Sequence, residues 1–165
     1  MLAACKDQGP DHPINTGTMT ATVDGVAWTA LSFDNTLSRG EVSGVPSKRL
    51  DIRADGNDGT TIMLAFGNLR DIDDDCIIPG SYPVDPDSNH CESGLCEASI
   101  GTFMPNLTTF WLTSIDDSVS AMTVTVCDAS INEISGTFDF WVYAADTPKH
   151  HIIGTFTDVT YPEID

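Results

Sequence analysis

Four aspartates within five positions form the densest group of potential metal ligands in this sequence. Carboxylates this close repel one another, and a bound Ca²⁺ would relieve the repulsion because it accepts several oxygen ligands. The simpler interpretation is a solvated acidic loop, which suits a chain with 25 acidic and seven basic residues. We prefer the solvated loop and expect no cofactor, with a weakly held structural Ca²⁺ as the alternative at Asp71, Asp73, Asp74 and Asp75.

The five cysteines fit disulfides better than a metal site. Cys91 and Cys96 are the closest pair, yet four residues separate them and no C-x2-C spacing occurs. Four cysteines can pair in three ways. We expect Cys91 to pair with Cys96 across a turn-rich loop, and Cys76 to pair with Cys127 because both border strands. Disulfides persist in oxidising compartments, so we expect the chain to be exported.

Cys5 is the cysteine left over, and its neighbours indicate a different chemistry. Leu2-Ala3-Ala4-Cys5 follows the pattern of a bacterial lipobox, in which the cysteine receives diacylglycerol and becomes the new N-terminus. We therefore expect the chain to begin inside its own signal peptide, with residues 1–16 forming the rest of that peptide and a flexible tether. The expected location is the outer membrane, on its periplasmic or its outer side. The lipid should be the sole membrane contact, because no apolar run approaches about 20 residues.

Three aromatic residues could form a binding surface. Trp111, Trp141 and Tyr143 each fall, by alternation, on the more polar side of their strands. Aromatic rings on a polar sheet face can stack on sugar rings or on a partner protein. The alternative is that they cover a second, smaller packing layer.

No catalytic residue can be assigned from the sequence. Gly40-Glu41-Val42-Ser43-Gly44 does not match the G-x-S-x-G nucleophile motif. His150 and His151 are neighbours on an expected strand and should point to opposite faces, so they cannot easily bind one ion. Paired carboxylates remain available for a hydrolase, since 25 acids would bring two together in almost any fold. A net charge of -18 repels phosphate backbones and argues against nucleic acid as a partner.

The elements that must position these residues are strands. From Gly17 onward apolar residues recur with period two, which predicts strands at residues 18–23, 49–54, 62–66, 81–84, 98–104, 108–115, 120–127, 134–143 and 152–161. Turn formers such as Asp24-Gly25 and the run from Asp55 to Gly59 separate them. We predict one domain over residues 17–165, all-β, built as an antiparallel sandwich or flattened barrel of about eight to ten strands.

Three segments carry a resemblance to a known family. They are the opening Gly25-Val26-Ala27-Trp28-Thr29-Ala30, the segment Ile134-Ser135-Gly136-Thr137-Phe138, and the ending Gly154-Thr155-Phe156. In these segments the chain is similar to small, uncharacterised Bacteroidetes lipoproteins. The resemblance implies an all-β domain on a lipid anchor and carries over no catalytic residue.

One tripeptide suggests a modification. Asp117-Ser118-Val119 resembles the acceptor of Bacteroidetes protein O-glycosylation and lies on an expected turn. Ser118 is therefore a candidate glycosylation site.

A tethered β domain without a nucleophile motif has the parts for presenting a surface rather than for breaking bonds. We therefore expect a lipid-anchored cell-envelope protein that acts as a non-catalytic binding or adhesion module for a glycan or an envelope partner. The first alternative is a subunit of a surface assembly built through strand edges. The second is a hydrolase that uses paired carboxylates.

Overall fold

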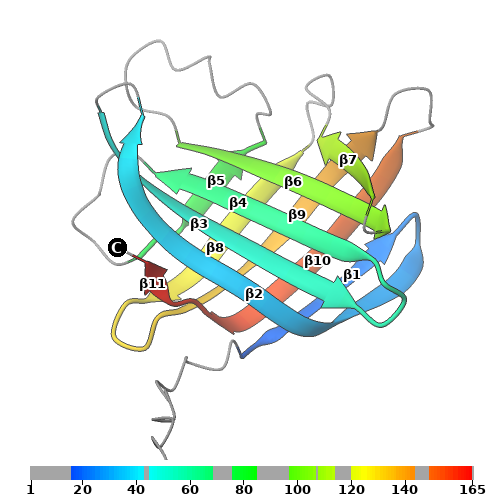
Figure 1. Ribbon diagram of the computed structural model, residues 1–165, viewed down its shortest axis with the longest axis horizontal. Helices are drawn as coiled ribbons and strands as arrows, with labels where there is room; N and C mark the ends of the chain where they lie inside the picture. The colour runs from blue at the N-terminus through cyan, green and yellow to red at the C-terminus, as the bar shows by residue number, and fades with distance from the viewer. Residues whose placement is uncertain are drawn as a thin grey trace, which may run out of the picture.

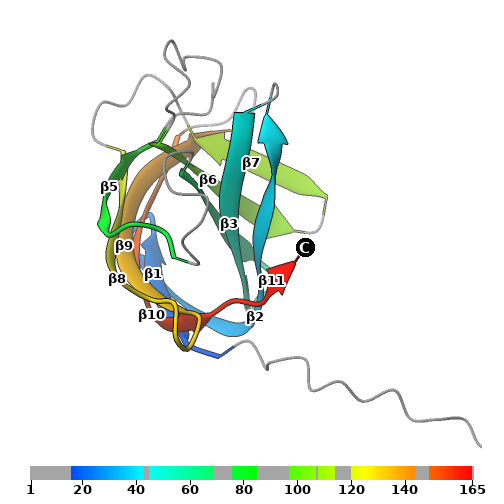
Figure 2. The same cartoon turned by 90° about the vertical axis from the view of Figure 1, so that its left-hand side faces the viewer.

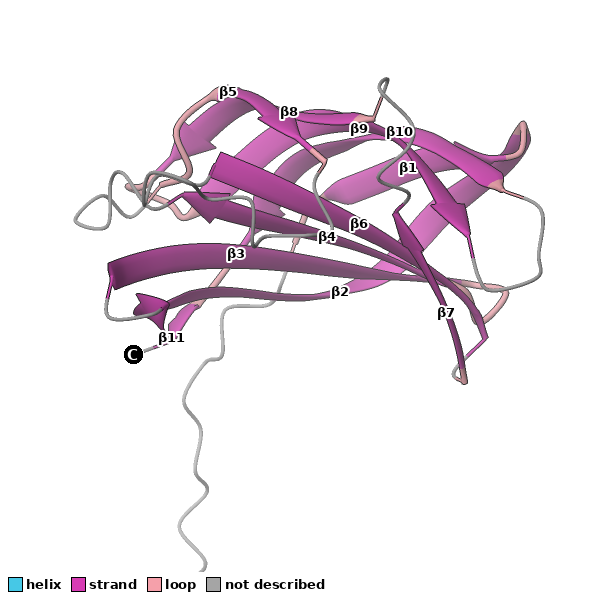
Figure 3. Cartoon of the chain, turned by 90° about the horizontal axis from the view of Figure 1, so that it is seen from above, coloured by secondary structure: helices cyan, strands magenta, loops and turns pink. Residues whose placement is uncertain are grey.

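The computed structural model describes residues 16–42, 45–68, 76–84, 97–106, 108–113, 120–143 and 149–164. The regular structure in these ranges is all β-strand (Figure 3). The strands are β1 (Thr18–Val23), β2 (Val26–Val42), β3 (Val45–Gly56), β4 (Thr61–Asn68), β5 (Gly80–Pro83), β6 (Glu97–Asn106), β7 (Thr109–Thr113), β8 (Ala121–Asp128), β9 (Glu133–Tyr143), β10 (His150–Thr160) and β11 (Glu163–Ile164). Within the described ranges there is no helix long and apolar enough to cross a membrane.

The strands form one sheet that bends into a ring. Its order is β10-β1-β2-β3-β4-β6-β7-β9-β8-β5, and β11 pairs in parallel with β2. The ring closes at β9, because one edge of β9 pairs with β10 while the other edge pairs first with β8 and then with β7. In Figure 1 a front wall of β2, β3, β4 and β6 crosses a back wall of β8, β9 and β10, and Figure 2 looks into the ring. The predicted all-β, antiparallel fold is confirmed.

The apolar side of each strand fills the interior of the ring, and the Gly-Thr-Phe triplets show how. Phe138 in β9 and Phe156 in β10 are buried, and each lies opposite a glycine of the other strand, Gly154 and Gly136 respectively. A Cβ atom on Gly154 would lie 2.5 Å from the Phe138 ring, and one on Gly136 would lie 2.5 Å from the Phe156 ring. The triplet therefore recurs because each glycine leaves the space that a neighbouring ring fills.

A disulfide holds one end of the ring. Cys76 and Cys127 are bonded across 51 positions of sequence, as predicted. The hydroxyl oxygen of Tyr161 lies 3.3 Å from the Cys127 sulfur and 3.7 Å from the Cys76 sulfur. Lys48 is buried beside them and donates a hydrogen bond from Nζ to the carbonyl oxygen of Cys76. This region is the disulfide end.

Different turns form the other end of the ring. The β1–β2 hairpin at Asp24-Gly25 and the β3–β4 turn at residues 56–60 lie there, as the turn formers predicted. The pairing of Thr61 with Met104 and of Val142 with His150 brings β6, β9 and β10 to the same end.

Candidate functional site

An apolar patch stands on the outside of the ring where β7 meets β9. Leu112 and Tyr143 are directly opposite each other in the ladder, and their side chains are 52% and 44% exposed. Phe110 lies two residues before Leu112 and is 56% exposed. Trp141 lies two residues before Tyr143, and residues two apart in a strand share a face. We call these four residues, Phe110, Leu112, Trp141 and Tyr143, the β7–β9 face.

The expectation that Trp111 shares this face is wrong. Its side chain points to the interior, where it packs against the buried core and lies 5.3 Å from the ring of Phe103, centroid to centroid. The expectation assumed that the more polar side of β7 would face the solvent. In the structure that side, with Thr109, Trp111 and Thr113, faces inward, and the apolar pair Phe110 and Leu112 faces outward. The other two predicted residues, Trp141 and Tyr143, do share the outer face.

The inward side of β7 carries an unfavourable group. Thr113 is 1% exposed, and its hydroxyl has no hydrogen-bond partner among the residues that the structure describes. Burying a hydroxyl without a partner costs free energy, as does leaving Phe110 and Leu112 in water. The short strand β7 is therefore inverted relative to the usual rule of apolar inside and polar outside.

Each of the two adjacent histidines stacks on a tryptophan. His151 lies on Trp141 with ring centroids 4.5 Å apart, and its Nε2 is 2.6 Å from Asp139 Oδ1 on the outer face. His150 lies on Trp111 with ring centroids 4.0 Å apart. The two imidazoles are thus on opposite faces of β10, as expected for neighbours on a strand.

His150 also fixes the β1–β2 hairpin. Its Nδ1 is 2.6 Å from Asp24 Oδ2, and the backbone N–H of His151 donates to Asp24 Oδ1 at 2.9 Å. The hydrogen bond from His150 lowers the pKa of Asp24, and the bond from the His151 backbone adds to this effect. The contact ties β1 to the start of β10.

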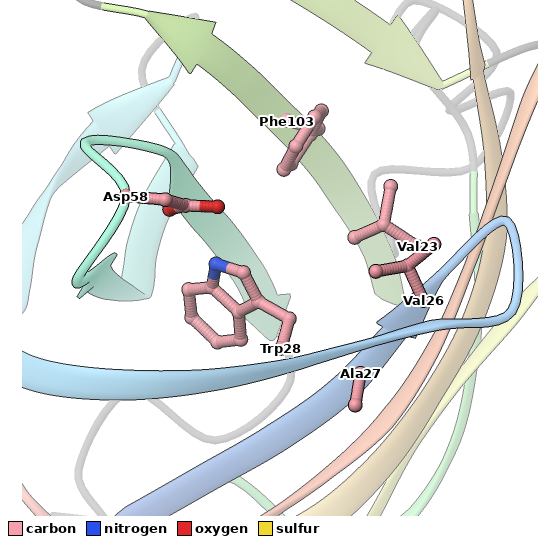
Figure 4. A pocket seen from close by; sticks show the side chains of 6 residues that line it. All are labelled: Val23, Val26, Ala27, Trp28, Asp58 and Phe103. Atoms are coloured by element: carbon pink, nitrogen blue, oxygen red, sulfur yellow. The ribbon is translucent and has the colours of Figure 1, made fainter.

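A pocket opens at the same end of the ring, and Figure 4 shows the side chains that line it. Its volume is about 240 Å³. Three strands and a turn supply the lining residues, which are Val23, Val26, Ala27, Trp28, Asp58 and Phe103. Asp58 is the one acid among these six described lining residues.

The other predicted sites fall outside the described residues. These are the lipidation site Cys5, the Cys91–Cys96 pair, the aspartates at 71 and 73–75, and the glycosylation candidate Ser118. Within the described ranges no group of three or more His, Cys, Asp or Glu side chains is placed to hold a metal ion. The calcium prediction concerns the undescribed loop and stays a prediction.

Comparison with known proteins gives no relative from which a function could be transferred. No protein-family model, no curated protein and no solved structure matches this chain.

Proposed function

We propose that this chain is a non-catalytic binding module of the bacterial cell envelope, and that its β7–β9 face binds a partner protein. Cys5 would carry the lipid anchor that holds the module at the outer membrane, with the residues after it as a tether. The proposal concerns binding because the described residues present an apolar surface at β7 and β9.

The inverted strand β7 is the observation that carries this proposal. Leu112 would gain by facing the interior, and the Thr113 hydroxyl would gain by facing water. Sequences break such local rules mainly where function requires it. Contiguous apolar side chains on a surface also mark interaction sites more often than single exposed residues do. A partner that covers Phe110, Leu112 and Tyr143 would offset the cost of the inversion.

The side chains of the face favour a protein over a glycan. Phe110 and Leu112 have no hydrogen-bonding group, whereas sugar hydroxyls need polar partners when they are buried. His151, which stacks on Trp141, already forms a hydrogen bond with Asp139. Aromatic residues are enriched at the centre of protein interfaces, where charged residues are depleted. A glycan ligand is the other outcome that the experiment below separates.

The disulfide supports the envelope location. A bond between Cys76 and Cys127 persists in oxidising compartments and is rare in the reducing cytosol. The lipobox pattern Leu2-Ala3-Ala4-Cys5 supports the proposal of a lipid anchor at Cys5. Metabolic labelling with a fatty acid tests the anchor directly, because Cys5→Ala should abolish the label while the Cys76→Ala/Cys127→Ala variant should keep it.

Assembly through strand edges has less support in this geometry. Closing the ring pairs both edges of β10, one with β1 and one with β9. Beyond β5, Val84 bridges to Ser99 of β6, and the Ser99 hydroxyl donates to the carbonyl oxygens of Tyr82 and Pro83. The strands at both ends of the sheet order are thus already engaged.

The test measures binding of the lipid-free domain to an envelope fraction of the native host. The variant Leu112→Ser/Tyr143→Ser removes apolar surface from the β7–β9 face. Val126→Ser/Ile131→Ser is the matched control, because both residues are 56% exposed and lie near the disulfide end. We expect the first variant to lose at least about tenfold in affinity, as hot-spot residues do when truncated, and the control to bind like the wild type.

Two treatments of the envelope fraction identify the ligand class. Protease treatment should abolish binding if the partner is a protein, and periodate oxidation should abolish it if the partner is a glycan. If periodate treatment alone abolishes binding, the ligand is a glycan and not a protein. Equal binding by both variants would reject the β7–β9 face as the binding surface.

A further inference from the structure

We propose that the pocket at the end of the ring binds a small organic cation, an ammonium group carried on an apolar body of roughly ten or fewer heavy atoms. The pocket is separate from the β7–β9 face, since it opens between the β1–β2 hairpin, the β3–β4 turn and β6 (Figure 4). The proposal therefore stands or fails independently of the partner protein.

The walls of the pocket provide an apolar site of small size. Trp28 and Phe103 form aromatic walls and are themselves largely buried, while Val23, Val26 and Ala27 line the hairpin side. A volume of about 240 Å³ lies below the roughly 300–1,000 Å³ of drug-sized sites. At about 30 Å³ of liquid volume per water, it corresponds to about eight waters, which sets the size of the ligand body.

The aromatic wall is fixed before any ligand arrives. Trp28 Nε1 donates to Thr60 Oγ1 at 2.7 Å, and Thr60 Oγ1 donates in turn to Asp58 Oδ1 at 2.5 Å. The backbone N–H of Thr60 donates to the same oxygen at 3.1 Å. Gly56 completes the arrangement, because a Cβ atom there would lie 2.5 Å from Trp28 Nε1. The indole cannot swing into the pocket without breaking this chain of hydrogen bonds.

Asp58 gives the pocket its charge. Figure 4 shows its carboxylate between Trp28 and Phe103, on the side of the β3–β4 turn. The backbone N–H and the hydroxyl of Thr60 both donate to Oδ1 of this carboxylate. The bond from the Thr60 hydroxyl lowers the pKa of Asp58, so the group is a carboxylate at neutral pH. A cation would be attracted to this carboxylate and to the faces of the two aromatic rings.

The net charge of the whole chain also favours a cation as the ligand. A net charge of -18 raises the local concentration of cations and lowers that of anions. A neutral ligand of the same shape would gain from the apolar walls alone. Selectivity for the cation over an isosteric neutral molecule is therefore the property that distinguishes this proposal from a plain apolar hollow.

Three aromatic probes of similar size test that selectivity by NMR titration of the domain. Benzylammonium is the cation, benzyl alcohol the neutral analogue and benzoate the anion. We expect benzylammonium to shift the indole N–H of Trp28 and the amides of residues 23–28 in a saturable way. Its affinity should exceed that of benzyl alcohol by about five- to tenfold, from one exposed ion pair and one cation–π contact. Benzoate should bind more weakly still.

A pair of matched variants assigns the selectivity to Asp58. Asp58→Asn keeps the side-chain oxygen that holds Thr60 but removes the charge. Asp128→Asn is the control, because Asp128 makes the same contacts with Ser130 in the β8–β9 turn, away from the pocket. We expect Asp58→Asn to remove the preference for the cation and Asp128→Asn to keep it.

Each result of these titrations either supports or overturns the proposal. Equal affinity for all three probes, or no saturable shift at Trp28, would overturn the proposal, as would an unchanged preference in Asp58→Asn. Should Asp58→Asn fail to fold, the comparison of probes on the unchanged protein still decides, because it needs no substitution. A preference for benzylammonium that disappears in Asp58→Asn and survives in Asp128→Asn supports it.

Discussion

Returning β7 to the usual pattern should stabilise the protein and abolish partner binding at the same time. Thr113→Val replaces a buried hydroxyl that has no hydrogen-bond partner among the described residues with a methyl group of similar size. Relief of the desolvation penalty should raise the free energy of unfolding by about 1–2 kcal/mol. Leu112→Thr removes an apolar side chain that is 52% exposed, and such surface changes stay within about 0.5 kcal/mol.

Thermal unfolding measures the change in stability of the Thr113→Val variant. In domains of 150–250 residues, 1 kcal/mol moves the Tm by about 2–4 °C, so Thr113→Val should raise the Tm by about 2–8 °C. Thr61→Val is the matched control, because Thr61 is also buried but its hydroxyl donates to Asp55 Oδ1 at 2.6 Å. The same substitution there should lower the free energy of unfolding by about 1 kcal/mol or more.

The double variant Leu112→Thr/Thr113→Val then separates stability from function. It should be at least as stable as the wild type and bind the envelope fraction no better than Leu112→Ser/Tyr143→Ser. A fall in Tm for Thr113→Val would show that the Thr113 hydroxyl has a hydrogen-bond partner in the wild type. Burial of this hydroxyl would then no longer be a cost of the inverted strand β7. Full binding by the stabilised double variant would refute the link between that cost and the binding surface.

Three further predictions concern the fold and its charges. Removing the disulfide with Cys76→Ala/Cys127→Ala should cost about 4 kcal/mol in the chain-entropy relation for a loop of this length, measured by denaturant unfolding, and a cost under about 1 kcal/mol would contradict it. Gly154→Ala should cost about 1–3 kcal/mol, because its Cβ atom would meet the carbonyl oxygen of Thr20 at 2.4 Å and the Phe138 ring at 2.5 Å, whereas Gly40→Ala meets nothing within 4 Å and serves as the control. The pKa of Asp24 is lowered by its hydrogen bond with His150, so this contact favours the folded state above the ordinary aspartate range and is lost as the pH falls through the lowered pKa. Carboxyl NMR of His150→Gln should show the pKa of Asp24 rising while the lowered pKa of Asp128, which depends on Ser130, stays in place.

Sequence periodicity predicts the strands whose two faces differ clearly. In β9 the buried residues Ile134, Phe138, Phe140 and Val142 alternate with exposed or half-buried ones. That alternation is visible without a structure, and it placed Trp141 and Tyr143 on the outer face. The disulfide between Cys76 and Cys127 was predicted from a different signal, namely that both cysteines border strands while Cys91 and Cys96 share a turn-rich loop.

The long strand β2 shows why other elements could not be predicted. A register shift between Ala30 and Ser32 changes the phase of the strand, so period two is broken along the chain. Asn35 is buried in that strand, where its side-chain amide donates to the Thr160 carbonyl oxygen and its side-chain oxygen accepts from the Arg53 backbone N–H. These partners lie in β10 and β3, far away in sequence, and a single sequence does not reveal them.

The candidate sites were predictable only in part for the same reason. The orientation of Trp111 depends on how the short strand β7 pairs with β6 and β9. The alternation of polar and apolar residues within β7 alone predicts that Trp111 faces the solvent. The pocket joins Trp28, Asp58 and Phe103, which lie on three separate segments of the chain. Local patterns gave no signal that these three residues meet.

The measurement that tests the central claim most directly is photo-crosslinking in the native host. A photoreactive benzoylphenylalanine replaces Leu112 on the β7–β9 face in one strain and Val126, which has a similar exposed fraction near the disulfide end, in another. We predict a discrete crosslinked envelope protein from position 112 that is missing from position 126. The absence of a product from position 112, or the same products from both positions, would contradict the claim that the β7–β9 face is a binding surface.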